Sequence, residues 1–185
     1  MAAAWVVSLN VGIPRPLRTG KGTVLSGIVK TPVTGARMVR RLNVEGDAQA
    51  DLTVHGGVDK AVYSYPFEHY ARWSAELGRA DLGPGMFGEN LTIAGLDETS
   101  VCVGDVLRIG AARLQVTKPR TPCFKLAAHV GRADFMKLFL ESRRTGWYAR
   151  VLEEGLVSAG DRVIREEAGH GPTVDEVVRE LLRRP

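Results

Sequence analysis

The sequence predicts one mainly β domain with a few helices. Its 21 glycines and 9 prolines, with only 6% aromatic residues, favour many turns and short strands over long helices. A chain of 185 residues that is 44% hydrophobic is long enough to bury a core of its own. No segment approaches the roughly 18 uninterrupted apolar residues of a membrane helix, so we expect a folded protein that stays out of the membrane.

The N-terminal half predicts strands first and then a helix. Residues 4–9, 23–29 and 36–42 are apolar or loosely alternating, with glycines and prolines between them, as is typical of short strands. Residues 62–65 predict a fourth strand that runs into Pro66. Proline suits the first position of a helix, and Tyr70, Trp73 and Leu77 then share one helical face up to Gly78.

The C-terminal half predicts a hairpin, a helix and further strands. Residues 106–109 and 113–116 are two strands joined by a short turn, and 101–103 and 162–164 are strand-like segments next to Gly-Asp turns. We expect Cys102, between two valines, to lie in the core. Phe135, Leu138 and Phe139 mark a second helix that we expect to end at Gly146, and residues 147–152 read as a strand.

The last residues predict an amphipathic helix. Thr173 and Glu176 have the spacing of a capping box, and one face of the helix is apolar: Val174, Val177, Val178, Leu181 and Leu182. This face must pack on the main domain, residues 1–168, or on another subunit, which leaves a homodimer open. Residues 169–185 are therefore expected to form a helical appendage.

The most informative segment surrounds Cys123. Residues 118–125 read Lys-Pro-Arg-Thr-Pro-Cys-Phe-Lys. Prolines stiffen the backbone and nearby cations favour a thiolate over a thiol, so this loop is suited to a reactive or metal-binding sulfur. A small apolar residue buried beside a turn is the alternative interpretation.

Charge is unevenly distributed along the chain. Residues 1–44 hold seven Lys or Arg and no acid, 45–117 hold five against eleven acids, and 118–150 hold eight against two. If the two basic segments converge, they would form a pocket for an anion such as a phosphate; a solvated basic face is the alternative. Binding of nucleic acid is disfavoured, because no nucleic-acid motif is present and few aromatic residues lie among the cations.

Two further segments contain unusual residues. In residues 46–62 the glycine pair Gly56 and Gly57 would let the backbone approach a ligand, with His55 and Lys60 as neighbouring donors. Residues 83–92 form a glycine-rich turn that ends in Glu89 and Asn90. Either segment alone reads equally as a structural turn.

The two cysteines, Cys102 and Cys123, lie in unlike contexts, which makes a disulfide framework unexpected and a reducing compartment expected. The N-terminus lacks the basic region of a secretory signal. We therefore expect a cytoplasmic protein.

Taken together, these segments resemble the MOSC domain, named for the C-terminal domain of molybdenum cofactor sulfurases. Over residues 5–165 the order and spacing match at Asp47, 55–62, 65–73, 87–92, 104–105 and 119–126. Within that family the chain is similar to a stand-alone bacterial branch associated with resistance to hydroxylaminopurine. The resemblance implies a MOSC-type β-barrel of mixed strands with a few peripheral helices, and residues 169–185 would then be the remnant of a small helical bundle.

The resemblance also implies a molybdenum-pterin cofactor, or molybdopterin, with Cys123 as metal ligand and catalytic residue. Soft thiolates suit such a metal, and the phosphate of the cofactor needs cations and backbone donors. The residues implied to bind the cofactor are His55, Gly56, Gly57, Lys60, Glu89, Asn90 and Arg120. Pyridoxal phosphate belongs to a fused desulfurase domain of relatives, for which this chain has no room.

The function implied is a molybdenum-dependent oxidoreductase that reduces N-hydroxylated bases and related small molecules to amines, a detoxification. Two cysteines cannot hold an iron-sulfur cluster with four thiolates, and no flavin or nicotinamide motif is present, so an external reductase must supply electrons. The alternative is a non-redox sulfur carrier with a persulfide on Cys123. A basic nucleic-acid-binding module would remain only if Cys123 proves dispensable.

Overall fold

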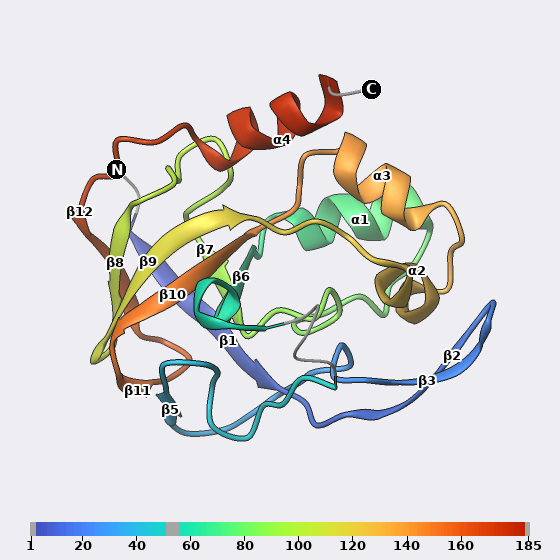
Figure 1. Cartoon of the computed structure of the whole chain (residues 1–185), viewed down its shortest axis with the longest axis horizontal. Helices are drawn as coiled ribbons and strands as arrows, with labels where there is room; N and C mark the ends of the chain where they lie inside the picture. Colours follow the sequence, from blue (N-terminus) through green and yellow to red (C-terminus); the bar gives the residue numbers. More distant parts are fainter. Residues whose placement is uncertain (1–2, 51–55, 184–185) are drawn as a thin grey trace.

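Seven strands close into a mixed β-barrel in the computed structural model, which describes residues 3–50 and 56–183 (Figure 1). Strands β6 and β7 are parallel, and every other neighbouring pair of the barrel is antiparallel. The barrel order is β1 (Ala4–Val11), β7 (Leu91–Ala94), β6 (Val62–Pro66), β10 (Trp147–Glu153), β9 (Ala112–Pro119), β8 (Val106–Ile109) and β12 (Arg162–Glu167), which returns to β1. The predicted mainly β fold is confirmed.

Shorter elements surround the barrel. Strand β4 (Thr31–Pro32) extends the sheet at β1, while β2 (Arg15–Thr19) with β3 (Gly22–Ser26) and β5 (Arg37–Val39) with β11 (Gly155–Val157) form separate two-stranded sheets. The helices are the single 3-10 turn η1 (Val58–Lys60), α1 (His69–Leu77), α2 (Phe124–Val130), α3 (Phe135–Glu141) and α4 (Val174–Arg183). None of these described helices is long and apolar enough to cross a bilayer.

Two hydrophobic clusters stabilise the molecule. One fills the barrel with inward-facing aliphatic residues, as the alternating burial of β9 illustrates. The other lies between the barrel and the helices and is aromatic: Trp73 of α1 stacks on Phe139 of α3, and Phe87 stacks on Phe135. The second cluster holds α1, α2 and α3 against the barrel on the side of β6.

Most predicted elements are present, but several bounds differ. The predicted strand 23–29 ends at Ser26, the predicted strand 36–42 is only Arg37–Val39, and residues 101–103 form an isolated bridge in place of a strand. Pro66 is the last residue of β6, not the first of a helix, and α1 begins at His69. Helix α3 ends at Glu141, well before Gly146. Gly146 instead has a φ of 63° directly before β10, where an added Cβ would lie 2.3 Å from the Ser64 carbonyl oxygen. A close backbone approach explains this glycine.

Helix α4 packs on the barrel of its own chain. Its predicted capping box is confirmed, because the Thr173 hydroxyl accepts a hydrogen bond from the Glu176 amide at 3.1 Å and Glu176 accepts one from the Thr173 amide at 2.8 Å. Val174 and Val178 are fully buried, whereas Leu181 is 37% exposed, so the predicted apolar face is buried only along its first two turns. Cys102 is half-buried and pairs with Thr173 in an isolated bridge, which corrects its expected place in the core.

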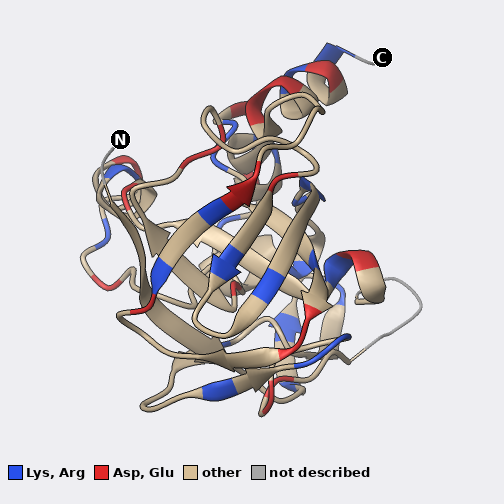
Figure 2. Cartoon of the chain, turned by 90° about the vertical axis from the view of Figure 1, so that its left-hand side faces the viewer, with Lys and Arg blue, Asp and Glu red and all other residues tan. Residues whose placement is uncertain are grey.

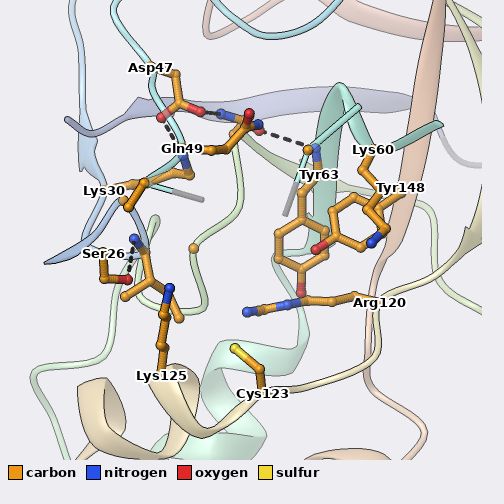
Figure 3. Close-up of a pocket in the computed structure, with 16 residues that line it drawn as sticks. Ser26, Lys30, Asp47, Gln49, Lys60, Tyr63, Arg120, Cys123, Lys125 and Tyr148 are labelled. Carbon is orange, nitrogen blue, oxygen red and sulfur yellow. Dashed lines mark hydrogen bonds and ion pairs between the residues drawn. The ribbon is translucent and has the colours of Figure 1, made fainter. Parts of the chain in front are cut away.

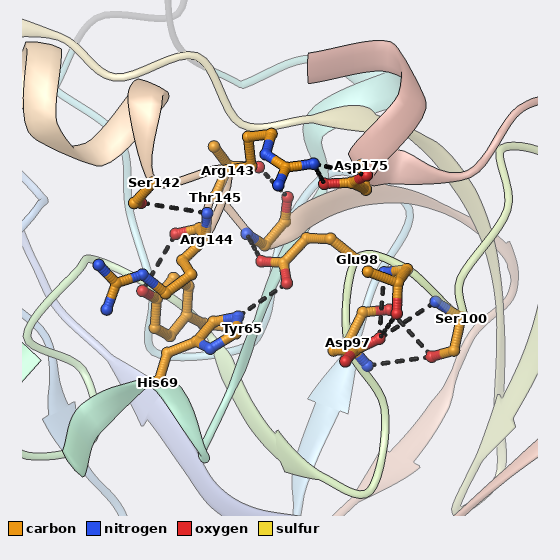
Figure 4. A network of polar contacts seen from close by, with 12 residues as sticks. Tyr65, His69, Asp97, Glu98, Ser100, Ser142, Arg143, Arg144, Thr145 and Asp175 are labelled. Carbon is orange, nitrogen blue, oxygen red and sulfur yellow. Dashed lines mark hydrogen bonds and ion pairs between the residues drawn. The ribbon is translucent and has the colours of Figure 1, made fainter. Parts of the chain in front are cut away.

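A buried polar network joins α4 to the barrel, with Glu98 at its centre (Figure 4). The Glu98 carbonyl oxygen accepts the Asp175 amide at 2.9 Å. The Glu98 carboxylate accepts the Gly146 amide at 2.7 Å and lies 2.7 Å from Nε2 of His69. Because the Gly146 carbonyl in turn accepts the Arg120 amide at 3.3 Å, this network fixes the chain that enters the Cys123 loop.

The outer face of the barrel carries both basic and acidic residues (Figure 2). Arg113 bridges three strands there, with ion pairs at 2.7 Å to Glu153, 2.9 Å to Glu166 and 2.7 Å to Glu167. The basic residues of this face are therefore largely paired.

Candidate functional site

A pocket opens beside the barrel where three parts of the chain meet (Figure 3). Residues after β3, residues 47–50 and the loop before α2 form its walls, and side chains of β6 and β10 reach into it. The lining residues are Ser26, Gly27, Ile28, Lys30, Asp47, Gln49, Ala50, Gly56, Lys60, Tyr63, Gly88, Asn90, Arg120, Cys123, Lys125 and Tyr148.

Cys123 is the N-cap residue of α2, and its thiol points into the pocket, close to Arg120 (Figure 3). Its backbone is extended, with φ −128° and ψ 167°, and its carbonyl oxygen accepts the Leu126 amide at 2.9 Å. The upstream side of the loop is held where Pro119 pairs with Trp147 at the end of the β9 and β10 ladder. The stiff loop predicted from the prolines therefore presents its sulfur at a fixed position.

Arg120 forms a buried cationic wall of the pocket. Its guanidinium donates a hydrogen bond to the Phe87 carbonyl and lies 4.8 Å from the centroid of the Tyr63 ring. Burial by itself lowers the pKa of Arg120, but Tyr63, Tyr148 and Cys123 around it raise that pKa above its ordinary value. Arg120 thus carries a permanent charge next to the thiol.

Lys30 and Asp47 form a nearly buried ion pair on the opposite wall. The Asp47 carboxylate also accepts the Gly12 amide at 2.9 Å and the Asn90 side-chain amide at 3.0 Å. Burial lowers the pKa of Lys30, although Asp47 and Glu89 oppose that shift. Lys30 is therefore a cation whose proton is held less firmly than that of an exposed lysine.

The lining is strongly electropositive. Among the described residues, the charged side chains that line the pocket are those of Lys30, Lys60, Arg120 and Lys125 and the carboxylate of Asp47. Lys30 comes from the acid-free N-terminal segment, and Arg120 and Lys125 come from the second basic segment. The structure therefore brings together the two basic segments, as an anion-binding pocket requires.

The phenols of the pocket add hydrogen-bond donors. Burial raises the pKa of Tyr63 well above its ordinary value and raises that of Tyr148, while Arg120 opposes both shifts. Tyr63 donates to the Thr145 carbonyl at 2.8 Å. Both phenols are consequently neutral and protonated at physiological pH.

The predicted glycines differ in their roles. Gly56 lines the pocket with a φ of 98°, and an added Cβ would lie 2.5 Å from the Gln49 Oε1 atom, so only glycine fits without displacing Gln49. Gly57 does not line the pocket; its carbonyl accepts the Lys60 amide at 3.0 Å and starts η1. His55 lies outside the described residues.

Glu89, which the sequence predicts as a cofactor-binding residue, does not reach the pocket. It is fully buried outside the pocket lining, and its carboxylate accepts hydrogen bonds from the Tyr70 hydroxyl, the Gly85 amide at 2.7 Å and the Thr92 hydroxyl at 2.8 Å. Burial raises the pKa of Glu89 even though these bonds oppose the shift. Glu89 therefore shapes the glycine-rich turn that forms one edge of the pocket.

Asn90 lines the pocket, but its side-chain amide forms hydrogen bonds within the protein. Its oxygen accepts the Tyr63 amide at 3.2 Å and its nitrogen donates to Asp47 at 3.0 Å. Sequence patterns do not mark Lys30, Gln49 or Tyr148 as lining residues, although all three line the pocket. Only the absence of acids before Glu45 pointed toward Lys30, and nothing in the strand pattern distinguishes Tyr148.

The donor set fits a metal that brings most of its own ligands. No group of three or more His, Cys, Asp or Glu residues suited to a metal occurs among the described residues, and the pocket offers one thiol with four cations. A molybdenum-pterin group, which carries sulfur ligands and a phosphate, matches one soft protein ligand beside a cationic wall.

Comparisons with known proteins show which family the chain is similar to. The model of the MOSC domain family matches residues 51–164. The chain is 50% identical to the uncharacterized protein YflK of Bacillus subtilis (strain 168) over 155 residues, covering 84% of this chain and 70% of that protein. It is 44% identical to protein YiiM of Escherichia coli (strain K12) over 173 residues, covering 85% of this chain and 77% of that protein.

A solved structure and a longer relative add to this. The crystal structure of YiiM from Geobacillus stearothermophilus superposes with a TM-score of 0.82 at 34% identity, covering 97% of this chain and 84% of that one. A protein named "Reductase" from Gibberella moniliformis (strain M3125 / FGSC 7600) is 35% identical over 145 residues. That match covers 77% of this chain but 26% of the relative, whose name therefore describes a much longer protein.

Proposed function

Because this chain belongs to the MOSC domain family, we propose that its pocket binds a molybdenum-pterin cofactor through Cys123 and that the protein reduces N-hydroxylated compounds to amines. The observation that carries the proposal is one thiol in the wall of a pocket whose described lining holds four cationic side chains and one carboxylate. The reductase-named relative supports oxidoreductase chemistry in the family at a coarser level.

The thiol and the cations of the pocket would bind different parts of the cofactor. Cys123 would supply the single protein ligand to the metal. Lys30, Lys60, Arg120 and Lys125 would neutralise the phosphate and the other negative charge of the cofactor, since charge-assisted hydrogen bonds to anions are the strong ones. Held by Cys123 and these cations, the cofactor would supply oxygen-atom-transfer chemistry, in which the substrate is reduced by two electrons.

The overall reaction needs two electrons and two protons. The N–O bond of a hydroxylamine R–NH–OH breaks, one proton is added to nitrogen and one to the departing oxygen, and the products are R–NH₂ and water. Lys30 can hold a proton at Nζ, and Tyr148 keeps its hydroxyl proton, because burial raises its pKa. Both side chains line the pocket and are the proposed proton donors.

Replacement of the thiol tests this proposal. Cys123→Ser, purified from a host that makes the cofactor, should contain no molybdenum and should not reduce a hydroxylamine with dithionite-reduced methyl viologen. Cys102→Ser is the matched control, because Cys102 lies outside the pocket, and it should keep both properties. Metal content by mass spectrometry and amine formation are the measurements. A Cys123→Ser protein that retains molybdenum would contradict the proposal.

The same samples address the sulfur-carrier alternative. A carrier would hold a persulfide on Cys123, visible as one added sulfur atom in the intact mass, and would show no viologen-driven reduction. Molybdenum in the wild-type protein together with turnover of a hydroxylamine would exclude that alternative as the sole function.

A further inference from the structure

A second hollow lies between the hairpin of β2 and β3 and the helices α2 and α3. In Figure 1 the hairpin extends away from the barrel, with α2 next to it. The floor of this groove is apolar and accessible, because Phe124 is 47% and Met136 37% exposed. Its rim carries Arg18, Lys21 and Arg132, and its described lining residues include no acid.

The cations on the hairpin side of the groove are not neutralised. The side chains of Arg18 and Lys21 form no ion pair or hydrogen bond with any described residue, whereas Arg132 is paired with Asp134 at 2.7 Å. This differs from the barrel face, where Arg113 is held by three glutamates. Exposed apolar side chains beside uncompensated positive charge are suited to an acidic protein surface.

Helix α2 separates this groove from the pocket of Cys123. Phe124, Ala127 and Ala128 face the groove, and Lys125 lines the pocket. Cys123 and Phe124 are consecutive, so their Cα atoms are about 3.8 Å apart. A protein bound in the groove would therefore contact Phe124, the residue that follows Cys123 in the chain.

We propose that this groove, lined by Arg18, Lys21, Phe124 and Met136, is the docking surface for an acidic electron-carrier protein. The inference rests on the proposed function, in which two electrons must reach the pocket for each N–O bond that is broken. A one-electron [2Fe–2S] carrier would be oxidised twice per amine formed, and solvent would return the two protons that Lys30 and Tyr148 donate. Transient redox complexes bury less than about 1,200 Å², so a small docking surface is sufficient.

Charge reversal on the hairpin tests the groove. The double variant Arg18→Glu/Lys21→Glu and the control Arg162→Glu should be compared with the wild type. Arg162 is an exposed residue of β12. Strand β12 lies on the opposite side of the molecule from the hairpin (Figure 1). Two probes are used as reductants of a hydroxylamine: a reduced acidic [2Fe–2S] ferredoxin or flavodoxin, and reduced methyl viologen. Binding of the oxidised carrier is measured separately by calorimetry, without substrate.

In the double variant, both the Kd and the KM for the acidic carrier should rise about tenfold or more. Both constants should also depend much less on salt concentration, since charges at an interface rim act mainly on association. Viologen-driven turnover should be unchanged, because that small reductant needs no docking. The Arg162→Glu variant should resemble the wild type in every assay.

The outcomes separate the two proposals. Carrier binding that is weakened by the double variant, in a protein that shows no viologen-driven reduction, would refute the proposed function and keep the docking surface. Equal carrier affinity in the wild type and the double variant would overturn the docking surface. A dimer that the double variant dissociates, or single-stranded nucleic acid that only the wild type binds, would assign the groove to another occupant and likewise overturn the inference.

Discussion

Arg120 contributes to both the fold and the pocket. Its guanidinium holds the Phe87 carbonyl, and its charge faces the thiol of Cys123. Removing a side chain that satisfies a buried carbonyl leaves that group unpaired, which costs about 1–3 kcal/mol. The sequence predicts Arg120 as a phosphate contact, and its structural role can be seen only once the turn at Phe87 is in place.

We expect Arg120→Ala to lower the free energy of unfolding by about 1–3 kcal/mol in urea denaturation and also to weaken anion binding. Lys125→Ala is the control, because Lys125 shares the pocket but has no such bond to the fold. It should weaken anion binding and leave the urea midpoint nearly unchanged. Equal stability of the two variants would show that the bond to Phe87 contributes nothing.

His129 makes stability depend on pH. Burial lowers the pKa of His129 below 6.5, and Arg15, Arg79 and Arg120 lower it further. Between that lowered pKa and 6.5 the unfolded chain binds the proton and the folded protein does not, so stability falls as pH falls through this window. In His129→Gln this contribution is absent.

The stability advantage of the wild type over His129→Gln should therefore shrink between about pH 7.5 and about pH 5.5. Thermal unfolding of both proteins at the two pH values measures it. An advantage that stays constant or grows on acidification would mean that His129 is not held neutral by its surroundings.

At the scale of elements, the amphipathic pattern of α4 predicts the buried face of the helix but not how much of its length is buried. The pattern gives five apolar positions, but the helix leaves the barrel surface after its second turn, so Leu181 stays 37% exposed. Periodicity identifies the face of a helix but does not set the length over which a neighbour covers it. The capping box, by contrast, depends on local contacts alone and was predicted correctly.

Val178→Ala should lower the free energy of unfolding by about 2 kcal/mol, since it removes two fully buried methyl groups and leaves a cavity. Leu181→Ala on the same helix removes more carbon atoms and should cost clearly less. Chemical denaturation of the two variants decides the point. The reverse order would mean that α4 packs through its last turn, for example in a dimer.

Other elements show why some local signals fail. Pro66 suits a helix start, yet its lack of an amide proton is equally compatible with the end of strand β6. Helix α2 has seven residues, too few for a periodic pattern to stand out, so the sequence did not predict it. The Cys123 loop was found because unusual residue types, not periodicity, mark it.

At the scale of the whole molecule, the cationic pocket couples anion binding to stability. A ligand that binds only the folded state at ten times its Kd stabilises it by about 1.4 kcal/mol. Pyrophosphate should therefore raise the melting temperature above that in chloride at equal ionic strength, and Lys60→Ala/Lys125→Ala should reduce the increase. Scanning calorimetry measures it. An equal increase in the double variant would attribute the effect to general salt binding.

The ladder between β1 and β12 joins the first strand of the chain to its last, pairing Ala4 with Val163 and Trp5 with Arg162. Such a closure gives the fold a high contact order, so folding should be slow compared with that of helical domains of equal size. During synthesis the barrel cannot close until β12 has left the ribosome exit tunnel. Until β12 emerges, the edge of β1 that it will cover stays unpaired, and an unpaired strand edge favours aggregation.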